Sequence, residues 1–395
     1  MTSALRPSLA ALAAALVAAC SPALAHGAPP ATSGEAALVA DARDGTVMHA
    51  ENAAERRPIA SATKLMTALL TLERADLDDT FPAAPYAASS VESQIGLAAG
   101  ERMTVRDLLV ALLLESANDA AVTLADGVAG SREAFVREMN RRAVTLGLRD
   151  TSYANPIGFD DPNNHSTARD LATLTRELFR HPEFVRIVDM PRATLESGAR
   201  TRVIDNRNGL VARYPFVSGV KTGHTLGAGY VLVGSGEAGG GAVVTVTLGA
   251  PSESARDADT LALLRWGLEQ FRRARVLRRG RVLARVDVEH RDEQVELGAA
   301  RPVRLVLRRG ERVRTSVDAP TELEGPLPAG EPVGWVEVRR GGETVRRVRL
   351  VTLAKIEDPG FIRKLGGGIG PVLTGVTVLG IVLLAMLGMR RRRTG

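Results

Sequence analysis

The pattern of hydrophobic and polar positions separates an apolar start, two folded parts and an apolar end. Within residues 36–273, short strand-like runs enclose a block in which apolar residues recur at helical spacing. Strands are expected at 37–41, 46–50, 229–235 and 242–249, and helices at 61–75, 105–129, 132–146, 168–181 and 255–272. The pair Asp44-Gly45 between the first two strands is typical of a hairpin turn. Strands that flank a helical block predict an α+β fold, an antiparallel sheet with helices packed against it.

Residues 274–357 have a different pattern, with short apolar runs and no long helical stretch. The runs lie at 276–277, 281–288, 303–307 and 336–338, and pairs such as Arg309-Gly310 and Gly341-Gly342 separate them. This pattern predicts a small all-β domain. Its many arginines are expected on a solvated sheet face, with binding to an anionic cell-envelope surface as the alternative.

Residues 1–25 have the features of an export signal. Arg6 provides the positive charge, and the apolar run at 9–19 is too short to span a bilayer. Ala23-Leu24-Ala25 matches the small-residue cleavage pattern, so the mature chain is expected to begin just after it. Cys20 lies in a context similar to a bacterial lipobox, which would instead make it a lipidated N-terminus. In both cases the protein is expected to leave the cytoplasm.

The other end of the chain carries a second membrane signal. Residues 369–389 contain no charge, and a helix of that length measures ~31 Å against a hydrocarbon core of ~30 Å. Four arginines follow at 390–393, and the positive-inside rule places them in the cytoplasm. We therefore expect a single transmembrane helix with a cytoplasmic tail at 390–395 and the rest of the mature chain outside. Residues 358–368 are expected to form a short stalk, and residues 26–35 a linker.

Composition narrows the possible chemistry. The chain has 47 Arg and only 4 Lys, and lysine can lose its proton in a protein whereas arginine cannot. One cysteine excludes an intrachain disulfide, and the six histidines have no zinc-site spacing, so no cofactor and no metal are expected. The net charge of +6 arises from 51 basic and 45 acidic residues, which does not favour a nucleic-acid partner.

The first candidate motif is Ser61-Ala62-Thr63-Lys64, at the start of a predicted helix. The spacing places the serine and lysine side chains on one helix face. A serine hydroxyl needs a neighbouring base, and a neutral lysine can serve if burial and a nearby cation lower its pKa. The N-terminus of the helix also directs backbone N–H groups toward the place where an oxyanion would form.

Two further motifs carry little information alone. Ser116-Ala117-Asn118 after a helical run is typical of a helix cap. Lys221-Thr222-Gly223-His224 before the predicted strand at 229–235 fits an ordinary turn. A permanent cation, a hydroxyl and a glycine would also suit a substrate with a free carboxylate. The order S-x-x-K, S-x-N, K-T-G on an exported chain is the signature of penicillin-recognising serine enzymes.

On these motifs the sequence resembles the low-molecular-mass D-alanyl-D-alanine carboxypeptidases, which are penicillin-binding proteins of peptidase family S11. The likeness extends to segments 56–67, 166–170, 206–210, 219–225 and 228–230 and to Arg256 with Trp266-Gly267. It is strong over 36–273 and looser over 274–357, where 329–334 resembles the family's β-rich second domain. The resemblance implies a catalytic domain like those of penicillin-recognising transpeptidases and β-lactamases. The predicted transmembrane helix is a departure, because family members often end in an amphipathic helix.

The resemblance implies roles in catalysis for four residues. Ser61 would attack the carbonyl between the last two D-alanines of the substrate, and Lys64 would be its general base. Ser116 would relay a proton to the departing D-alanine amine. Asn118 would hold Lys64 and the substrate amide.

It also implies a binding site for the substrate's terminal carboxylate. Lys221 and Thr222 would hold this group, with Arg256 as a weaker helper. Gly223 would allow the backbone to approach closely. The oxyanion hole would consist of the N–H groups of Ser61 and His224, and the His224 side chain itself would not act in catalysis.

The implied partners are the peptidoglycan stem peptide, β-lactam antibiotics and the membrane. A soluble β-lactamase would carry a glutamate in an E-x-x-L-N segment, but residues 155–188 contain none, and Glu177 lies within a predicted helix in an unrelated context. A DD-endopeptidase remains open because only the leaving group differs. The three intact motifs argue against a non-catalytic wall-binding protein. The exact muropeptide, the role of the β-rich part and the oligomeric state remain open at this point.

Overall fold

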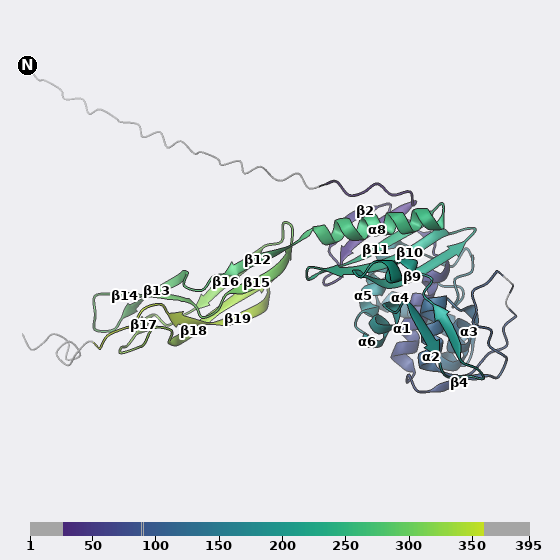
Figure 1. The fold of residues 1–395 in the computed structure, drawn as a ribbon, viewed down its shortest axis with the longest axis horizontal. Helices are drawn as coiled ribbons and strands as arrows, with labels where there is room; N and C mark the ends of the chain where they lie inside the picture. Colours follow the sequence, from purple (N-terminus) through teal and green to yellow (C-terminus); the bar gives the residue numbers. More distant parts are fainter. Residues whose placement is uncertain (1–26, 88, 90, 359–395) are drawn as a thin grey trace, which may run out of the picture.

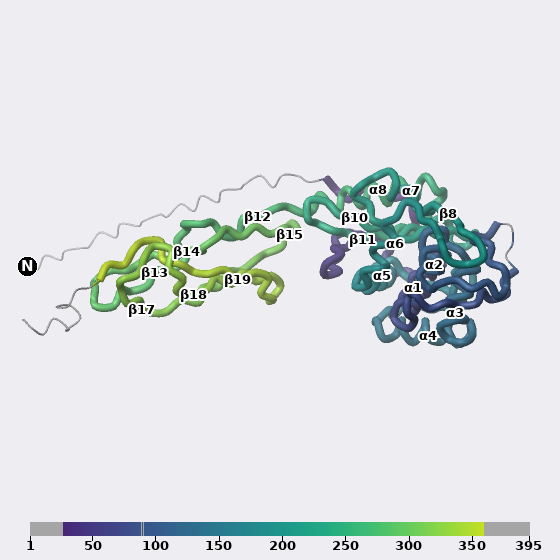
Figure 2. The backbone as a smooth tube through the Cα atoms, turned by 60° about the horizontal axis from the view of Figure 1, so that its bottom comes forward, coloured from purple at the N-terminus to yellow at the C-terminus, as the bar shows by residue number. Residues whose placement is uncertain are grey.

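The computed structural model describes residues 27–87, 89 and 91–358. The predicted export signal, nearly all of the predicted stalk and the predicted span at 369–389 lie outside these residues. Within them, no helix is long and apolar enough to cross a bilayer. The described chain forms an N-terminal domain, residues 27–270, and a C-terminal domain, residues 271–358, which lie end to end (Figures 1 and 2).

The N-terminal domain is built on a five-stranded antiparallel sheet in the order β2-β1-β11-β10-β9. Its strands are β1 (Ala36–Asp41), β2 (Val47–Glu51), β9 (Val217–Thr225), β10 (Gly229–Ala238) and β11 (Gly241–Ala250). Helix α8 (Glu253–Glu269) covers one face, and a block of helices covers the other (Figure 1). This arrangement confirms the predicted α+β fold.

The alternation of side chains along β1 explains why the whole strand is buried. Ala37 and Val39 pack with Leu263 and Leu264 of α8. The intervening residues, including Leu38, belong to the larger core between the sheet and the helical block. Successive side chains of a strand point to opposite faces, so a sheet covered on both sides needs apolar residues at every position.

The helical block consists of short helices joined by tight connections. They are η1 (Ala60–Thr63), α1 (Lys64–Arg74), α2 (Val105–Val110), η2 (Ala111–Glu115), α3 (Asn118–Ala129), α4 (Arg132–Thr145), α5 (Ala168–Leu178), α6 (Pro182–Val188) and α7 (Gly209–Arg213). Three small ribbons complete the domain: β3 (Arg57–Pro58) with β6 (His165–Ser166), β4 (Thr80–Pro82) with β5 (Arg102–Thr104), and β7 (Arg192–Leu195) with β8 (Arg202–Asp205). Side-chain oxygens of Thr104, Ser131 and Thr167 accept a backbone N–H at the starts of α2, α4 and α5, which fixes where these helices begin.

The C-terminal domain is all β, as predicted. Strands β12 (Phe271–Leu277) and β15 (Val303–Arg308) pair with each other. A six-stranded sheet follows the order β16-β18-β19-β14-β13-β17. Its strands are β13 (Val282–Val288), β14 (Gln294–Ala299), β16 (Val313–Asp318), β17 (Glu322–Leu323), β18 (Pro332–Arg340) and β19 (Glu343–Thr352). Val336, Val338, Leu297 and Leu350 lie in its own hydrophobic core.

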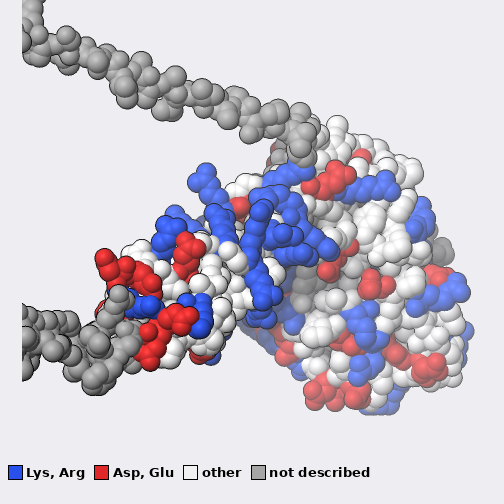
Figure 3. All heavy atoms as spheres, turned by 60° about the vertical axis from the view of Figure 1, so that its left-hand side comes forward, with Lys and Arg blue, Asp and Glu red and all other residues white. Residues whose placement is uncertain are grey.

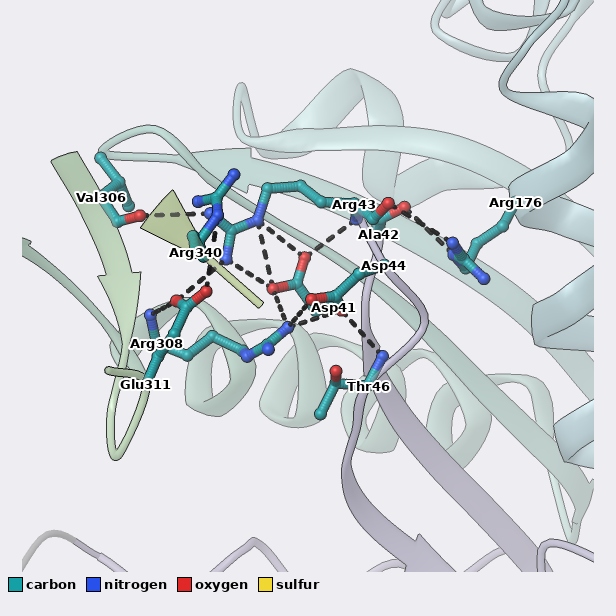
Figure 4. Close-up of polar contacts among 10 residues, drawn as sticks. All are labelled: Asp41, Ala42, Arg43, Asp44, Thr46, Arg176, Val306, Arg308, Glu311 and Arg340. Carbon is teal, nitrogen blue, oxygen red and sulfur yellow. Dashed lines mark hydrogen bonds and ion pairs between the residues drawn. The ribbon is translucent and has the colours of Figure 1, made fainter. Parts of the chain in front are cut away.

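A charged cluster joins the two domains (Figure 4). The Asp41 carboxylate is fully buried and accepts hydrogen bonds from Arg43, at 2.6 Å, and from Arg308 of β15, also at 2.6 Å. Arg308 also donates to Asp44, and these hydrogen bonds outweigh burial and lower the pKa of Asp44 to about 2. Removing one partner of a buried ion pair typically costs about 3–5 kcal/mol. The cluster therefore fixes the C-terminal domain at one place on the sheet.

Several local predictions differ from the structure. The predicted helix at 105–129 is interrupted, because η2 ends at Glu115 and Ser116 adopts a left-handed conformation with φ of 64°. The helix predicted at 168–181 ends at Leu178, and α6 is a separate helix that begins with Pro182. The predicted linker forms no helix or strand, but Ser33 and Gly27 bond to Asp259 and Trp266 of α8, so it lies on the domain surface.

Candidate active site

The proposed nucleophile and base meet where η1 joins α1. The Lys64 Nζ donates to the Ser61 Oγ at 3.0 Å and to the Ile157 carbonyl at 2.6 Å. Lys64 is fully buried, whereas Ser61 is only partly buried. A partly exposed hydroxyl thus lies beside an amine that is shielded from water.

A tight loop contact holds this segment in place. A Cβ on Gly158 would lie 2.0 Å from the Ala60 carbonyl oxygen, so only glycine allows the loop to pass there. Ala60 itself has a φ of 45°. The Thr67 hydroxyl donates to the Pro156 carbonyl at 2.7 Å, one turn beyond Lys64. The loop around residues 156–158 therefore positions both Ser61 and the Lys64 amine.

Burial lowers the pKa of Lys64 well below its ordinary value, because the charged form loses hydration. The positive charge of Lys221 acts in the same direction, and the carboxylates of Glu92 and Asp119 oppose it. The neutral amine is the form that can accept the Ser61 proton. Lys64 therefore has both features expected of a lysine base, which are burial and a nearby cation that lowers its pKa.

The S-x-N motif lies at the interruption between η2 and α3. Ser116 and Asn118 are each 6% exposed, and Asn118 is the first residue of α3. The Asn118 amide donates to the Glu92 carboxylate at 2.9 Å. Among the described residues, Lys64 bonds to Ser61 and Ile157 and not to Asn118, so the expected Lys64–Asn118 contact is not formed here.

The K-T-G motif lies within β9, an edge strand of the sheet, and the turn considered for it is wrong. A Cβ on Gly223 would lie 2.9 Å from the Ser61 backbone nitrogen and 3.1 Å from the Ala60 Cβ. Glycine therefore lets the strand backbone approach the nucleophile. This approach brings the two segments expected to provide the oxyanion hole side by side.

Lys221 is the second buried lysine of the site. Burial, together with the charges of Arg256 and Arg207, lowers its pKa to about 7, while Glu115 acts in the opposite direction. Its amine donates to the Thr222 carbonyl at 2.9 Å. Lys221 therefore loses its proton more readily than an ordinary lysine, and its expected role as a permanent cation stays a prediction. A bound carboxylate would favour the protonated form.

The remaining predicted residues lie beside this group. Arg256 of α8 is 3% exposed and is bound to Asp257 at 2.8 Å and to Glu253 at 2.9 Å. It influences Lys221 through its charge, but its guanidinium is already held by two carboxylates. The exposed His224 ring stacks on Tyr230 with 4.1 Å between centroids.

Sequence reasoning missed Glu92 and Tyr86. Both come from the loop between β4 and β5, and the Tyr86 hydroxyl donates to the same Glu92 oxygen as Asn118 does. No local motif marks this loop, and only the tertiary structure brings it into contact with Asn118. Glu177, considered above as a β-lactamase glutamate, instead pairs with Arg142 and Arg180.

Comparisons with known proteins agree with this geometry. A family model described as D-alanyl-D-alanine carboxypeptidase, peptidase S11, matches residues 24–252. A model described as penicillin-binding protein 5, C-terminal domain, matches residues 271–358. Together these matches cover both domains of the described chain.

Individual relatives and structures are similar over most of their length. The chain is 32% identical to the D-alanyl-D-alanine carboxypeptidase DacD of Escherichia coli, over 85% of this chain and 90% of that protein. It is 30% identical to DacF of Bacillus subtilis, over 83% of this chain and 87% of that protein. Penicillin-binding protein 5 of Haemophilus influenzae superposes with a TM-score of 0.60 at 27% identity, over 84% of this chain and 100% of that one. The Streptomyces K15 DD-transpeptidase superposes with a TM-score of 0.59 at 30% identity, over 62% and 100%.

The lysine beside Ser61 can be tested by a substitution that keeps its charge. We expect Lys64→Arg to lower the rate of acylation by penicillin more than about tenfold, since arginine stays protonated and cannot accept the Ser61 proton. The measurement is stopped-flow or gel-based labelling with a fluorescent penicillin. Lys355→Arg is the matched control, because Lys355 is exposed and pairs with Glu357 in the other domain. A Lys64→Arg protein that keeps more than a tenth of the rate would exclude Lys64 as the base.

Proposed function

Because the chain belongs to peptidase family S11 and is a D-alanyl-D-alanine carboxypeptidase, we propose that it acts through an ester on Ser61. The observation that carries this proposal is the 3.0 Å contact between the Ser61 Oγ and the buried amine of Lys64. Of the four lysines, Lys64 and Lys221 belong to this site, and both have a lowered pKa. The substrate is the D-Ala-D-Ala end of a peptidoglycan pentapeptide.

In the first step, neutral Lys64 accepts the Ser61 proton while the Ser61 Oγ attacks the carbonyl of the penultimate D-alanine. The N–H groups of Ser61 and His224 stabilise the resulting oxyanion. The proton reaches the leaving amine by way of Ser116, and D-alanine departs. Water then hydrolyses the ester and regenerates Ser61.

The free carboxylate of the terminal D-alanine binds to Lys221 and Thr222. A buried cation gives a strong interaction because little water screens it. Arg256 supports this site from behind by adding positive charge, although Glu253 and Asp257 hold its side chain.

We also propose that the protein is exported and held in the cell membrane by residues 369–389. The support is in the sequence: an N-terminal export signal, an uncharged stretch long enough to span, and four terminal arginines. The catalytic domain would then lie outside the cytoplasm, where its substrate is. The C-terminal domain would separate it from the bilayer.

The nucleophile can be tested with the full chain in detergent. We expect intact-mass spectrometry to show one penicillin adduct per chain, because the opened lactam stays attached and cannot diffuse away. Ser61→Ala should form no adduct and release no D-alanine from a pentapeptide muropeptide, whereas Ser316→Ala, an exposed serine of β16, should behave as wild type.

An adduct on the Ser61→Ala protein would show that another residue is the nucleophile. Rapid hydrolysis of nitrocefin would instead favour a β-lactamase. Cleavage of a crosslinked muropeptide dimer faster than D-alanine release would favour an endopeptidase.

The membrane proposal predicts how the protein is released. Alkaline carbonate should leave the full chain in the membrane fraction, since a spanning helix inserts almost irreversibly, and a chain ending at residue 368 should be soluble. Protease added outside intact protoplasts should digest both described domains. Release of the full chain by carbonate, or protection of these domains, would contradict the anchor.

A further inference from the structure

Charge is divided unequally between the two domains. Residues 271–358 carry 20 Arg and Lys against 14 Asp and Glu, whereas residues 27–270 carry 24 against 31. Basic side chains gather on the part of the C-terminal domain nearest the N-terminal domain, and acidic ones lie toward its other end (Figure 3). A basic surface of this kind is a candidate binding site for an anion.

The outer face of strands β16, β18 and β19 carries much of this charge. Val336 and Val338 are fully buried, so Trp335, Glu337 and Arg339 of β18 point outward. Cross-strand pairing places further residues on the same face, namely Arg314, Ser316 and Asp318 of β16 and Thr344, Arg347 and Arg349 of β19. We call Arg314, Arg339, Arg347, Arg349 and Trp335 the arginine face.

The arginine face is poorly neutralised. Arg314 and Arg339 are direct cross-strand partners, and like charges in that position destabilise a sheet. The Arg314 side chain forms no hydrogen bond or ion pair with any described residue, and the Arg339 side chain donates only to the Gly342 carbonyl. The nearest carboxylate contact is Glu337 to Arg347, at a long 3.7 Å. These exposed guanidinium groups are therefore available to an external anion.

Trp335 gives the face a fixed geometry. The guanidinium carbons of Arg349 and Arg347 lie 3.8 and 4.3 Å from its ring centroid. Cation–π contacts of this kind orient the guanidinium planes and leave their N–H groups free for an acceptor. Two arginines are thus already ordered before any ligand binds.

The position of the face distinguishes two possible anions. Next to it, Arg340 reaches Glu311 at the junction between the domains. The opposite end of the domain, near residue 358, has more carboxylates than cations. Its acidic residues are Asp287, Glu289, Asp292, Glu293, Glu322, Glu324, Glu357 and Asp358, and its cations include Arg291 and Lys355, paired with Glu293 and Glu357. If residues 369–389 span the membrane, the acidic end faces the lipid headgroups, and an anionic bilayer would not attract it.

We propose that the arginine face binds a phosphodiester polymer of the cell wall and so holds the enzyme beside its substrate. The polymer's repeated phosphates match several guanidinium groups spaced along three strands, and arginine pairs with phosphate through two N–H groups at once. This goes beyond the carboxypeptidase activity and does not depend on it. The choice of a wall polymer over lipid rests on the proposed C-terminal anchor.

The test compares two triple variants of the full chain in detergent with equal changes in charge. The first variant, Arg314→Gln, Arg339→Gln and Arg349→Gln, removes three of the four arginines of the face. The second, Arg278→Gln, Arg279→Gln and Arg281→Gln, removes three exposed arginines between β12 and β13. We expect the first to weaken binding to poly(glycerol phosphate) about tenfold at low salt and the second less than about twofold. D-alanine release from a soluble peptide should be unchanged in both.

Three outcomes would overturn the proposal. They are no binding by the wild type, equal losses in the two variants, or a loss confined to vesicles of anionic phospholipid. The last would identify a membrane contact instead. Thermal unfolding at the wild-type temperature excludes misfolding as the cause of a loss.

A second and independent observation concerns Glu92. Asp119 accepts the N–H groups of Ile95 and Leu97, and the Asn118 N–H donates to the Ser93 carbonyl, so α3 fixes this loop. The Glu92 carboxylate accepts hydrogen bonds from the side chains of Asn118 and Tyr86 and from the Ser89 N–H. We propose that Glu92 is a positioning residue that orients Asn118 and places a negative charge toward Lys64.

The charges around Lys64 predict the direction in which a change at Glu92 would shift the pKa of Lys64. Lys221 lowers the pKa of Lys64, whereas Glu92 and Asp119 raise it. Loss of the Glu92 charge should therefore lower the pKa of Lys64 further. In the pH–rate profile of acylation, the rate rises on the acidic side as Lys64 loses its proton, and this limb should move to lower pH. On the basic side the rate falls as Lys221 loses its proton, and this limb should change little.

The second proposal rests on Lys64 as the base and is tested by the pH dependence of acylation by a fluorescent penicillin. Glu92→Gln should shift the acidic limb downward and lower the maximal rate roughly fivefold, since Asn118 loses a charge-assisted partner. Tyr86→Phe keeps the charge and should leave the limb in place, as should Glu196→Gln, an exposed glutamate on the surface.

If the Glu92→Gln protein is acylated but the acidic limb of its pH–rate profile does not shift, the role proposed for Glu92 is wrong and the proposed function still stands. Absence of acylation in the wild type would instead refute the proposed function.

Discussion

The active site depends on two lysines that are buried close to each other and shielded from water. Lys64 and Lys221 are both almost completely buried, and neither forms an ion pair with a described carboxylate. Burial without a paired anion destabilises the charged form of an amine, and the charge of Lys221 makes the charged form of Lys64 still less favourable. The site therefore holds a base whose neutral form is favoured by burial beside a second lysine whose charged form a substrate carboxylate would stabilise. A surface lysine could do neither.

The fold provides this environment by packing a strand edge against the start of a helix. Gly223 lets β9 approach Ser61, and Gly158 lets the 156–158 loop cover Ala60. A side chain at either position would push the two segments apart. The five-stranded sheet is covered on both faces, so β9 is held rigidly while its outer edge faces the helical block. Catalytic geometry thus follows from close backbone contacts.

The C-terminal domain adds a different kind of organisation. Its attachment relies on the buried Asp41 carboxylate, which two arginines from different domains share (Figure 4). Such a cluster has directional bonds and fixes an orientation better than an apolar patch would. The arginine face lies beside this junction and the acidic end lies away from it, so the domain presents opposite charges to its two surroundings.

The sequence by itself determined the α+β class, the all-β second domain, the hairpin at Asp44-Gly45 and the identity of the motif residues. The fold classes and the hairpin follow from the local periodicity of apolar residues and from turn residues. The motif residues follow from a combination of residue types and spacings that few kinds of enzyme share. Tertiary structure decided that Ser116 interrupts a helix, that Lys221 lies on a strand, that its pKa falls to about 7 and that Glu92 reaches Asn118. Burial and contacts between distant segments produce all four, and no local pattern records which loop will cover which side chain.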